Sequence, residues 1–140
     1  KTHRRQRQMC IRDRVVDDAA QGITHVVRGA DLLDSTPRQV YLQRLLGYTT
    51  PQYAHLPVAA NPDGEKLSKQ TRARHVDTGT PLDTLCAVLD FLRQPLPEDA
   101  QLASLEELWQ WAIDHWTPAA VPGRRSLTAP ATWSIDTPPA

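Results

Sequence analysis

The segment from Asn61 to Gln70 reads NPDGEKLSKQ and places two lysines three residues apart around a serine. Asn-Pro and Asp-Gly dipeptides are typical of turns, so the sequence predicts that Lys66 and Lys69 lie on a mobile, solvent-facing loop. Two ammonium groups and the hydroxyl of Ser68 would together suit a polyphosphate ligand. The alternative is a solvated charged loop without a ligand, because so short a motif often occurs by chance.

Arg28 is the second residue whose position points to chemistry. It ends a short run with two valines, residues 25–28, which predicts a strand that delivers a guanidinium group at its carboxyl end. A guanidinium is planar and permanently charged, and it can bind a carboxylate through two parallel hydrogen bonds, which a lysine does not reproduce. The alternative is a structural ion pair with Asp17, Asp18 or Asp31.

The elements around these residues predict an α/β protein. Residues 15–18 and 25–28 predict strands, Asp34–Pro37 supplies the start of a helix that Gly47 can end, and residues 54–60 predict a short buried strand. Strand, helix, strand and lysine loop is the order of a parallel nucleotide-binding fold, because such sheets bind ligands beyond the carboxyl ends of their strands. We therefore expect the lysine loop at that edge of a sheet.

Two further helices are predicted in the second half of the chain. Thr80-Pro81 opens a helix that continues to Arg93, and Ser104 with Glu107 has the spacing of a capping box for a helix to about His115. Apolar spacing predicts the buried faces of the first two helices. These are Val40, Leu42, Leu45 and Leu46 on one helix, and Leu82, Leu85, Val88, Leu89 and Leu92 on the other.

Composition limits the class of protein. The 140 residues are 40% hydrophobic and 6% aromatic, enough for one domain with a modest core. No apolar run approaches the length of a membrane span, and the first residues lack the apolar stretch of a secretory signal, so we expect a cytoplasmic protein without a membrane partner. Cys10 and Cys86 are isolated, which argues against a zinc site or a disulfide framework within the chain. Cys86 is predicted to be a small core residue, and the tryptophans near residue 110 are expected to pack rather than to stack on bases.

The net charge of zero conceals an asymmetry. Residues 1–14 carry six Lys or Arg and one Asp, whereas the rest of the chain carries ten basic and fifteen acidic residues. We interpret residues 1–14 as a disordered or foreign leader. An arm that binds nucleic acid is the alternative.

Four motifs in register carry a family resemblance. VRGADLL at 27–33, TPRQ at 36–39, HLP at 55–57 and KLSKQ at 66–70 occur in the order and spacing of the C-terminal half of a class I glutamyl-type aminoacyl-tRNA synthetase catalytic domain. The chain resembles that family, and KLSKQ looks like its KMSKS loop. Gln70, where glutamyl-tRNA synthetases usually carry Arg, makes the loop similar to that of the glutamyl-Q tRNA(Asp) synthetases, a branch without an anticodon-binding domain.

The resemblance implies an α/β fold class, namely the C-terminal half of a class I Rossmann-type catalytic domain followed by a small helical region. We expect a leader at 1–14, a partial catalytic domain at 15–79, a helical region at 80–116 and a proline-rich irregular tail at 117–140. The family's ATP-cradling His-x-Gly-His loop and the zinc-binding cysteines of many members belong to an N-terminal half that the sequence lacks. The family's glutamate-binding tyrosine would fall near Cys10, so we expect a fragment that is inactive alone.

The resemblance also implies a reaction and its residues. Glutamate is activated with ATP and Mg²⁺, and a monomer passes the glutamyl group to queuosine in the anticodon of tRNA(Asp). Lys69, assisted by Lys66, would contact ATP as negative charge develops on its phosphates, Ser68 would donate its hydroxyl, and Arg28 would contact glutamate. His55 is expected to be a satisfied packing residue. A fragment of an ordinary glutamyl-tRNA synthetase and a noncatalytic nucleic-acid-binding module remain alternatives.

Overall fold

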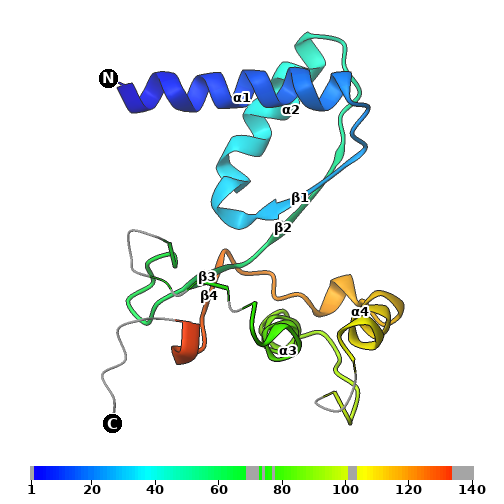
Figure 1. Cartoon of the computed structure of the whole chain (residues 1–140). Coiled ribbons are helices and arrows are strands. Elements are labelled where there is room, and N and C mark those ends of the chain that lie inside the picture. Colours follow the sequence, from blue (N-terminus) through cyan, green and yellow to red (C-terminus); the bar gives the residue numbers. More distant parts are fainter. Residues whose placement is uncertain (1, 69–72, 74, 77, 101–103, 134–140) are drawn as a thin grey trace. The chain divides into compact units, whose positions relative to one another are not determined.

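The computed structural model describes residues 2–68, 73, 75–76, 78–100 and 104–133, with side chains described from Ile11 onward. The chain divides into two compact units, Lys1–Leu56 and Pro57–Ala140. Each unit contains helices and one two-stranded parallel sheet, as Figure 1 shows. The predicted α/β class with parallel strands is therefore confirmed.

The N-terminal unit has a strand, helix, strand order. Its elements are α1 (Thr2–Ala20), β1 (His25–Gly29), the 3₁₀ helix η1 (Ala30–Ser35), α2 (Thr36–Leu45) and β2 (Gln52–Leu56). β1 and β2 pair in parallel, which requires a crossover connection, here η1 and α2. The register places Arg28 beside His55. The predicted strand at 25–28 and the helix that follows it are confirmed.

Helix α1 overturns one prediction. Residues 15–18 are helical and not a strand, and Val15 is 1% exposed while α1 packs against α2. Two adjacent valines are a short signal, and the flanking Arg and Ala residues tolerate a helix well. The same helix includes residues 2–14, so the disorder expected there is not what the structure shows. Their foreign origin stays a prediction.

Helix α2 begins and ends where the sequence predicts, but its predicted inner face is only partly right, because Val40 and Leu42 are half-buried and Leu45 and Leu46 are exposed. Pro37 lies in its first turn, and Gly47 just beyond its end has a φ of 70°. Gln39 and Gln43 are the buried residues, whereas Leu45 is 65% exposed. These amides are buried because they find hydrogen-bond partners on the sheet, which apolar spacing cannot indicate.

The C-terminal unit also contains a parallel strand pair. Its elements are β3 (Val58–Ala60), α3 (Pro81–Phe91), α4 (Leu105–Asp114), η2 (Pro118–Ala120), β4 (Ser126–Thr128) and η3 (Ala131–Trp133). β3 pairs with β4, so the single strand predicted at 54–60 is two strands in different sheets. Pro57, which has no N–H for a ladder, separates them. The tail predicted to be irregular contains β4, a strand of three residues that leaves little signal in the sequence.

The core of the C-terminal unit lies between α3 and α4. It consists of Leu85, Cys86, Leu89, Ala100, Leu108 and Ala112, with Leu82 packed against them. The predicted face of α3 is confirmed except for Val88, which is 37% exposed, and burial raises the pKa of the Cys86 thiol. The capping box is present: Ser104 Oγ accepts from the Glu107 amide at 3.2 Å, and Glu107 Oε2 accepts from the Ser104 amide at 2.8 Å.

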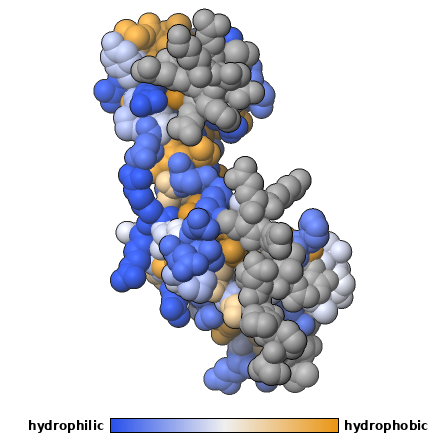
Figure 2. Space-filling view, turned by 90° about the vertical axis from the view of Figure 1, so that its left-hand side faces the viewer, coloured by the Kyte–Doolittle hydropathy of each residue, from blue (hydrophilic) through white to orange (hydrophobic). Residues whose placement is uncertain are grey.

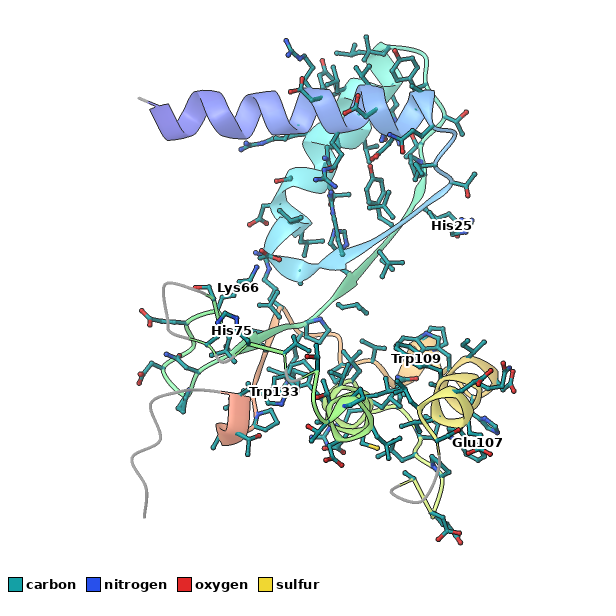
Figure 3. All side chains as sticks on the ribbon, viewed as in Figure 1. His25, Lys66, His75, Glu107, Trp109 and Trp133 are labelled. Carbon is teal, nitrogen blue, oxygen red and sulfur yellow. The ribbon has the colours of Figure 1, made fainter. Side chains whose placement is uncertain are left out.

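The tryptophans on α4 and just beyond its end pack less than the sequence predicts. Trp111 stacks on His115 with ring centroids 3.7 Å apart, but Trp109 and Trp116 are 53% and 40% exposed. Trp109 projects from α4 in Figure 3. Figure 2 shows apolar patches among the hydrophilic surface, in agreement with the number of large apolar side chains that are exposed.

Candidate functional site

Arg28 lies near the carboxyl end of β1, on one face of the N-terminal sheet. Side chains alternate along a strand, so Val27 points to the opposite face and is 65% exposed, whereas Arg28 is half-buried. Tyr53 and His55 alternate in the same way on β2, and the register pairs His55 with Arg28. The strands therefore bring an arginine, a histidine and a tyrosine to one face.

Neutral side chains surround the guanidinium group of Arg28. Its Nη2 donates to Thr36 Oγ1 and to Gln39 Oε1, both at 2.7 Å, and its Nε donates to His55 Nε2 at 3.3 Å. The Cζ atom lies 5.2 Å from the centroid of the Tyr53 ring, within the range of a cation–π contact. Thr36 and Gln39 are three residues apart on α2 and so share a helix face. We call Thr36, Gln39, Tyr53 and His55 the arginine cradle.

The arginine cradle replaces the expected alternative of a structural ion pair. The hydrogen-bond partners that Arg28 has among the described residues are neutral. Burial is the largest effect on the pKa of Arg28 and lowers it. Among the smaller effects, the charge of Arg14 also lowers this pKa, whereas the charges of Tyr53, Asp18 and Asp31 raise it. An arginine remains protonated despite such effects, so its positive charge is held without a bound carboxylate. This arrangement suits an anion from outside the chain.

His55 is fixed in one protonation state by its neighbours. Its Nε2 accepts from Arg28 Nε and lies 2.9 Å from Thr36 Oγ1. Because an arginine can only donate, Nε2 must be unprotonated and the ring proton must be on Nδ1. Burial, and then the charge of Arg28, lower the pKa of His55. His55 is thus a satisfied neutral residue, in agreement with the sequence prediction.

Behind the cradle, Gln43 holds Tyr53. Gln43 is 2% exposed, and its Nε2 donates to the Tyr53 hydroxyl at 2.9 Å. Within the described part of the chain its Oε1 is buried without a partner. The bond fixes the ring on which Arg28 rests.

The lysine loop follows β3 as a tight turn. Asn61 Oδ1 accepts from the Glu65 amide at 2.8 Å, the Asn61 amide donates to the Glu65 carbonyl at 2.8 Å, and Gly64 has a φ of 84°. Lys66 forms a bridge with Ala60 and is exposed, as predicted (Figure 3). The turn chemistry of the Asn-Pro-Asp-Gly segment therefore has the expected structural result.

The second half of the loop is only partly described. The Leu67 amide donates to the Ala59 carbonyl at 2.8 Å, and Ser68 is half-buried. Lys69 and Gln70 lie outside the described residues. The structure thus places Arg28 in the N-terminal unit, and Lys66 and Ser68 in the C-terminal unit.

Sequence reasoning gave no site role to Thr36, Gln39 or Tyr53. Two signals could have found them. Thr36 and Gln39 have the i, i+3 spacing of one helix face, and Tyr53 precedes His55 by two residues, the period of a strand face. Both signals become useful only once α2 is known to cover the face of β1 that carries Arg28.

The described residues contain no group of three or more His, Cys, Asp or Glu that could hold a metal ion. None of the helices in the same residues combines the length and the apolar character needed to cross a membrane.

Comparison with known proteins gives a family match and close relatives. Residues 13–96, which include Arg28 and the lysine loop, match the family of tRNA synthetases class I (E and Q), catalytic domain. The chain is 55% identical over 120 residues to glutamyl-Q tRNA(Asp) synthetase of Aromatoleum aromaticum, with 86% of this chain and 38% of the relative covered. It is 56% identical over 117 residues to the protein of that name from Dechloromonas aromatica, with 84% and 39% covered. The chain therefore spans less than two fifths of the length of these relatives.

Among solved structures, the chain resembles the glutamate-tRNA synthetase from Elizabethkingia anophelis. The TM-score is 0.55 at 23% sequence identity, and the match covers 84% of this chain and 27% of that chain. This likeness shows a shared fold.

Proposed function

The chain belongs to the family of class I tRNA synthetases (E and Q), whose catalytic domain it matches, and on this basis we propose that it forms the glutamate-binding part of a glutamyl-Q tRNA(Asp) synthetase. In that reaction a carboxylate oxygen of glutamate attacks the α-phosphorus of ATP, with Mg²⁺ bound to the nucleotide. The bond from this phosphorus to the bridging oxygen breaks, and pyrophosphate leaves. A hydroxyl of queuosine in tRNA(Asp) then attacks the glutamyl carbonyl of the adenylate, the bond from this carbonyl carbon to the phosphate oxygen breaks, and AMP leaves.

The observation that carries the proposal is the arginine cradle. Arg28 keeps its charge while every hydrogen bond that it makes to described residues goes to a neutral group. A carboxylate that arrives from outside therefore meets a positioned cation to which no carboxylate of a described residue is hydrogen-bonded, and a bond of this charged kind contributes about 1.5–3 kcal/mol. In our proposal, Arg28 binds a carboxylate of glutamate.

The lysine loop would act on ATP. Adenylation increases the negative charge on the α-phosphate and on the departing pyrophosphate, and cations that reach this charge in the transition state lower the barrier. Lys69 is the first candidate for this contact because it matches the second lysine of the family loop, with Lys66 assisting and Ser68 donating its hydroxyl. The exposure of Lys66 is compatible with this role.

The choice of acceptor distinguishes this proposal from an ordinary glutamyl-tRNA synthetase. The names of the curated relatives support tRNA(Asp). A glutamyl-tRNA synthetase would instead esterify glutamate to the end of tRNA(Glu).

A chimera tests the proposal. The segment of this chain that aligns with the Aromatoleum aromaticum relative, 120 residues, would replace the corresponding segment of that protein. We expect glutamate-dependent ATP–pyrophosphate exchange and transfer of labelled glutamate to tRNA(Asp) carrying queuosine. A chimera that folds but shows no exchange would refute the adenylation role, and transfer to tRNA(Glu) alone would favour the glutamyl-tRNA synthetase.

A further inference from the structure

One edge of the Arg28 guanidinium is occupied by two side chains that also contact each other. Nε donates to His55 and Nη2 donates to Thr36, and the two acceptor atoms are 2.9 Å apart. The second hydrogen of Nη2 is used by Gln39. The side-chain hydrogen bonds of Arg28 to described residues thus start from Nε and Nη2, and none of them starts from Nη1.

We propose that His55 and Thr36 form a positioning pair that holds the Nε and Nη2 edge of Arg28, and that the pair works only while His55 is neutral with its proton on Nδ1. The pair touches Arg28 and not the substrate. What Arg28 then binds rests on the proposed function, whereas the geometry of the pair does not.

The order of donors and acceptors gives the pair its direction. Thr36 Oγ1 accepts from Nη2 of Arg28, so its own proton is free to go to Nε2 of His55. Nε of Arg28 shares the single lone pair of the same Nε2 at the longer distance of 3.3 Å. A proton added to Nε2 removes this acceptor for both neighbours and places a second cation beside Arg28.

Among the described residues in contact with Arg28, His55 is the histidine, and burial and then the charge of Arg28 lower its pKa. The other titratable groups whose charge reaches Arg28 are Tyr53 on β2, Arg14 and Asp18 on α1, and Asp31 on η1. Arginine, aspartate and tyrosine ordinarily titrate outside this range, whereas histidine titrates near 6.5. A change in the position of Arg28 within this range is therefore assigned to His55.

The affinity of the site for glutamate should therefore depend on pH, and this dependence should come from His55 and not from the titration of glutamate. The carboxylates of glutamate titrate near 4 and stay ionised down to about pH 5.5. Protonation of His55 would break the pair and therefore weaken glutamate binding. The affinity for glutamate would fall about tenfold for each pKa unit by which bound glutamate lowers the pKa of His55.

The experiment uses the full 140-residue chain, labelled with ¹⁵N, without glutamate and between pH 5 and 8. Imidazole spectra report the tautomer of His55, and the Nε–H signal of Arg28 reports its hydrogen bonds. We expect the Nδ1–H tautomer at pH 7.5 and a shift of the Arg28 signal with the same midpoint as His55. His55→Gln, which keeps an acceptor near Nε2, should make the Arg28 signal independent of pH. Thr36→Val should move it at every pH, and Thr36→Ser should restore it.

An Nε2–H tautomer at pH 7.5, or an Arg28 signal that does not follow the His55 midpoint, would overturn the inference. A glutamate titration of the chimera and of its His55→Gln variant separates the inference from the proposed function. A chimera that binds glutamate, with an Arg28 signal that does not follow His55, keeps the function and rejects the pair. The expected spectra together with a chimera that folds but binds no glutamate at any pH support the pair and reject the function.

Discussion

Nη2 of Arg28 donates a 2.7 Å hydrogen bond to Oγ1 of Thr36, which ties the start of α2 to the carboxyl end of β1. Hydrogen bonds from a charged donor are shorter and stronger than neutral ones. With His55 on β2 as the third member, the position of Arg28 is set by a helix and both strands of its sheet. A binding cation held by three elements loses little freedom when a ligand arrives.

The N-terminal unit should lose stability as the pH falls. The pKa of His55 is lowered in the folded state by burial and by Arg28, so below about pH 6.5 the unfolded chain binds more protons. The contribution of His55 is fully present above that pH and decreases as the pH falls toward the folded-state pKa. Hydrogen exchange of β1 and β2 amides at pH 7.5 and 5.5, after correction for intrinsic rates, measures this. His55→Gln should remove the difference and His115→Gln, at the exposed C-cap of α4 in the other unit, should not. Equal pH dependence in all three proteins would contradict the prediction.

Leu108 should be a main support of the C-terminal unit. It is fully buried at 0% exposure, so Leu108→Ala should leave a cavity and cost about 2–5 kcal/mol. Leu105, three residues earlier on the same helix and 37% exposed, is the matched control, and Leu105→Ala should cost less than about 1 kcal/mol. All four tryptophans lie in this unit, so urea unfolding followed by fluorescence reports it directly. Equal losses in both variants would mean that the assigned faces of α4 are wrong.

Ser104→Ala should remove the cap of α4 at a cost of about 1 kcal/mol, whereas Ser104→Asp keeps an acceptor and should cost much less. The hydrogen bonds from the Ser104 amide and hydroxyl lower the pKa of Glu107. The ionised Glu107 side chain therefore stabilises the folded state above the ordinary pKa of a glutamate, and this contribution is lost as the pH falls through the lowered value, whereas the bond from the Glu107 amide to Ser104 Oγ stays. An NMR titration of Glu107 should show its pKa rising in Ser104→Ala. A pKa that does not change would contradict the capping account.

Local signals predicted the fold best. The valines before Arg28, Pro37 and Gly47 around α2, and the Ser104 capping box each act within a few residues, and each element lies where it was expected. Signals that depend on distant partners failed. Val15 is buried against a helix and not in a sheet, and β4 exists only because it pairs with β3.

In the candidate site, too, local signals could be recognised in the sequence, whereas contacts between distant residues could not. The place of Arg28 near the end of its strand could be predicted from the valines before it, and its contact with glutamate stays a prediction. Thr36 and Gln39 could not, because their role depends on which face α2 turns toward β1. The buried Gln43 shows the same effect, since a glutamine is buried only where the fold supplies a partner such as Tyr53.

Lys69→Ala should sharply reduce glutamate-dependent ATP–pyrophosphate exchange in the chimera, by about 100-fold or more, if Lys69 stabilises charge that develops in the transition state. Lys66→Ala should have a smaller effect, since we assign it an assisting role. The reduction should be mainly in kcat, because an interaction made in the transition state leaves substrate binding little changed. Unchanged exchange in a folded Lys69→Ala chimera would refute its role.

The central claim is that Arg28, held by neutral groups, recognises a carboxylate of glutamate. The most direct measurement compares the KM values for glutamate and for ATP in the exchange reaction of the chimera and of its Arg28→Ala variant, with Arg38→Ala, at an exposed position of α2, as the control. We predict that Arg28→Ala raises the KM for glutamate at least about tenfold, as loss of a charged hydrogen bond requires, while the KM for ATP changes less than about twofold. Equal increases in both KM values, or an Arg38→Ala variant that behaves like Arg28→Ala, would contradict the claim.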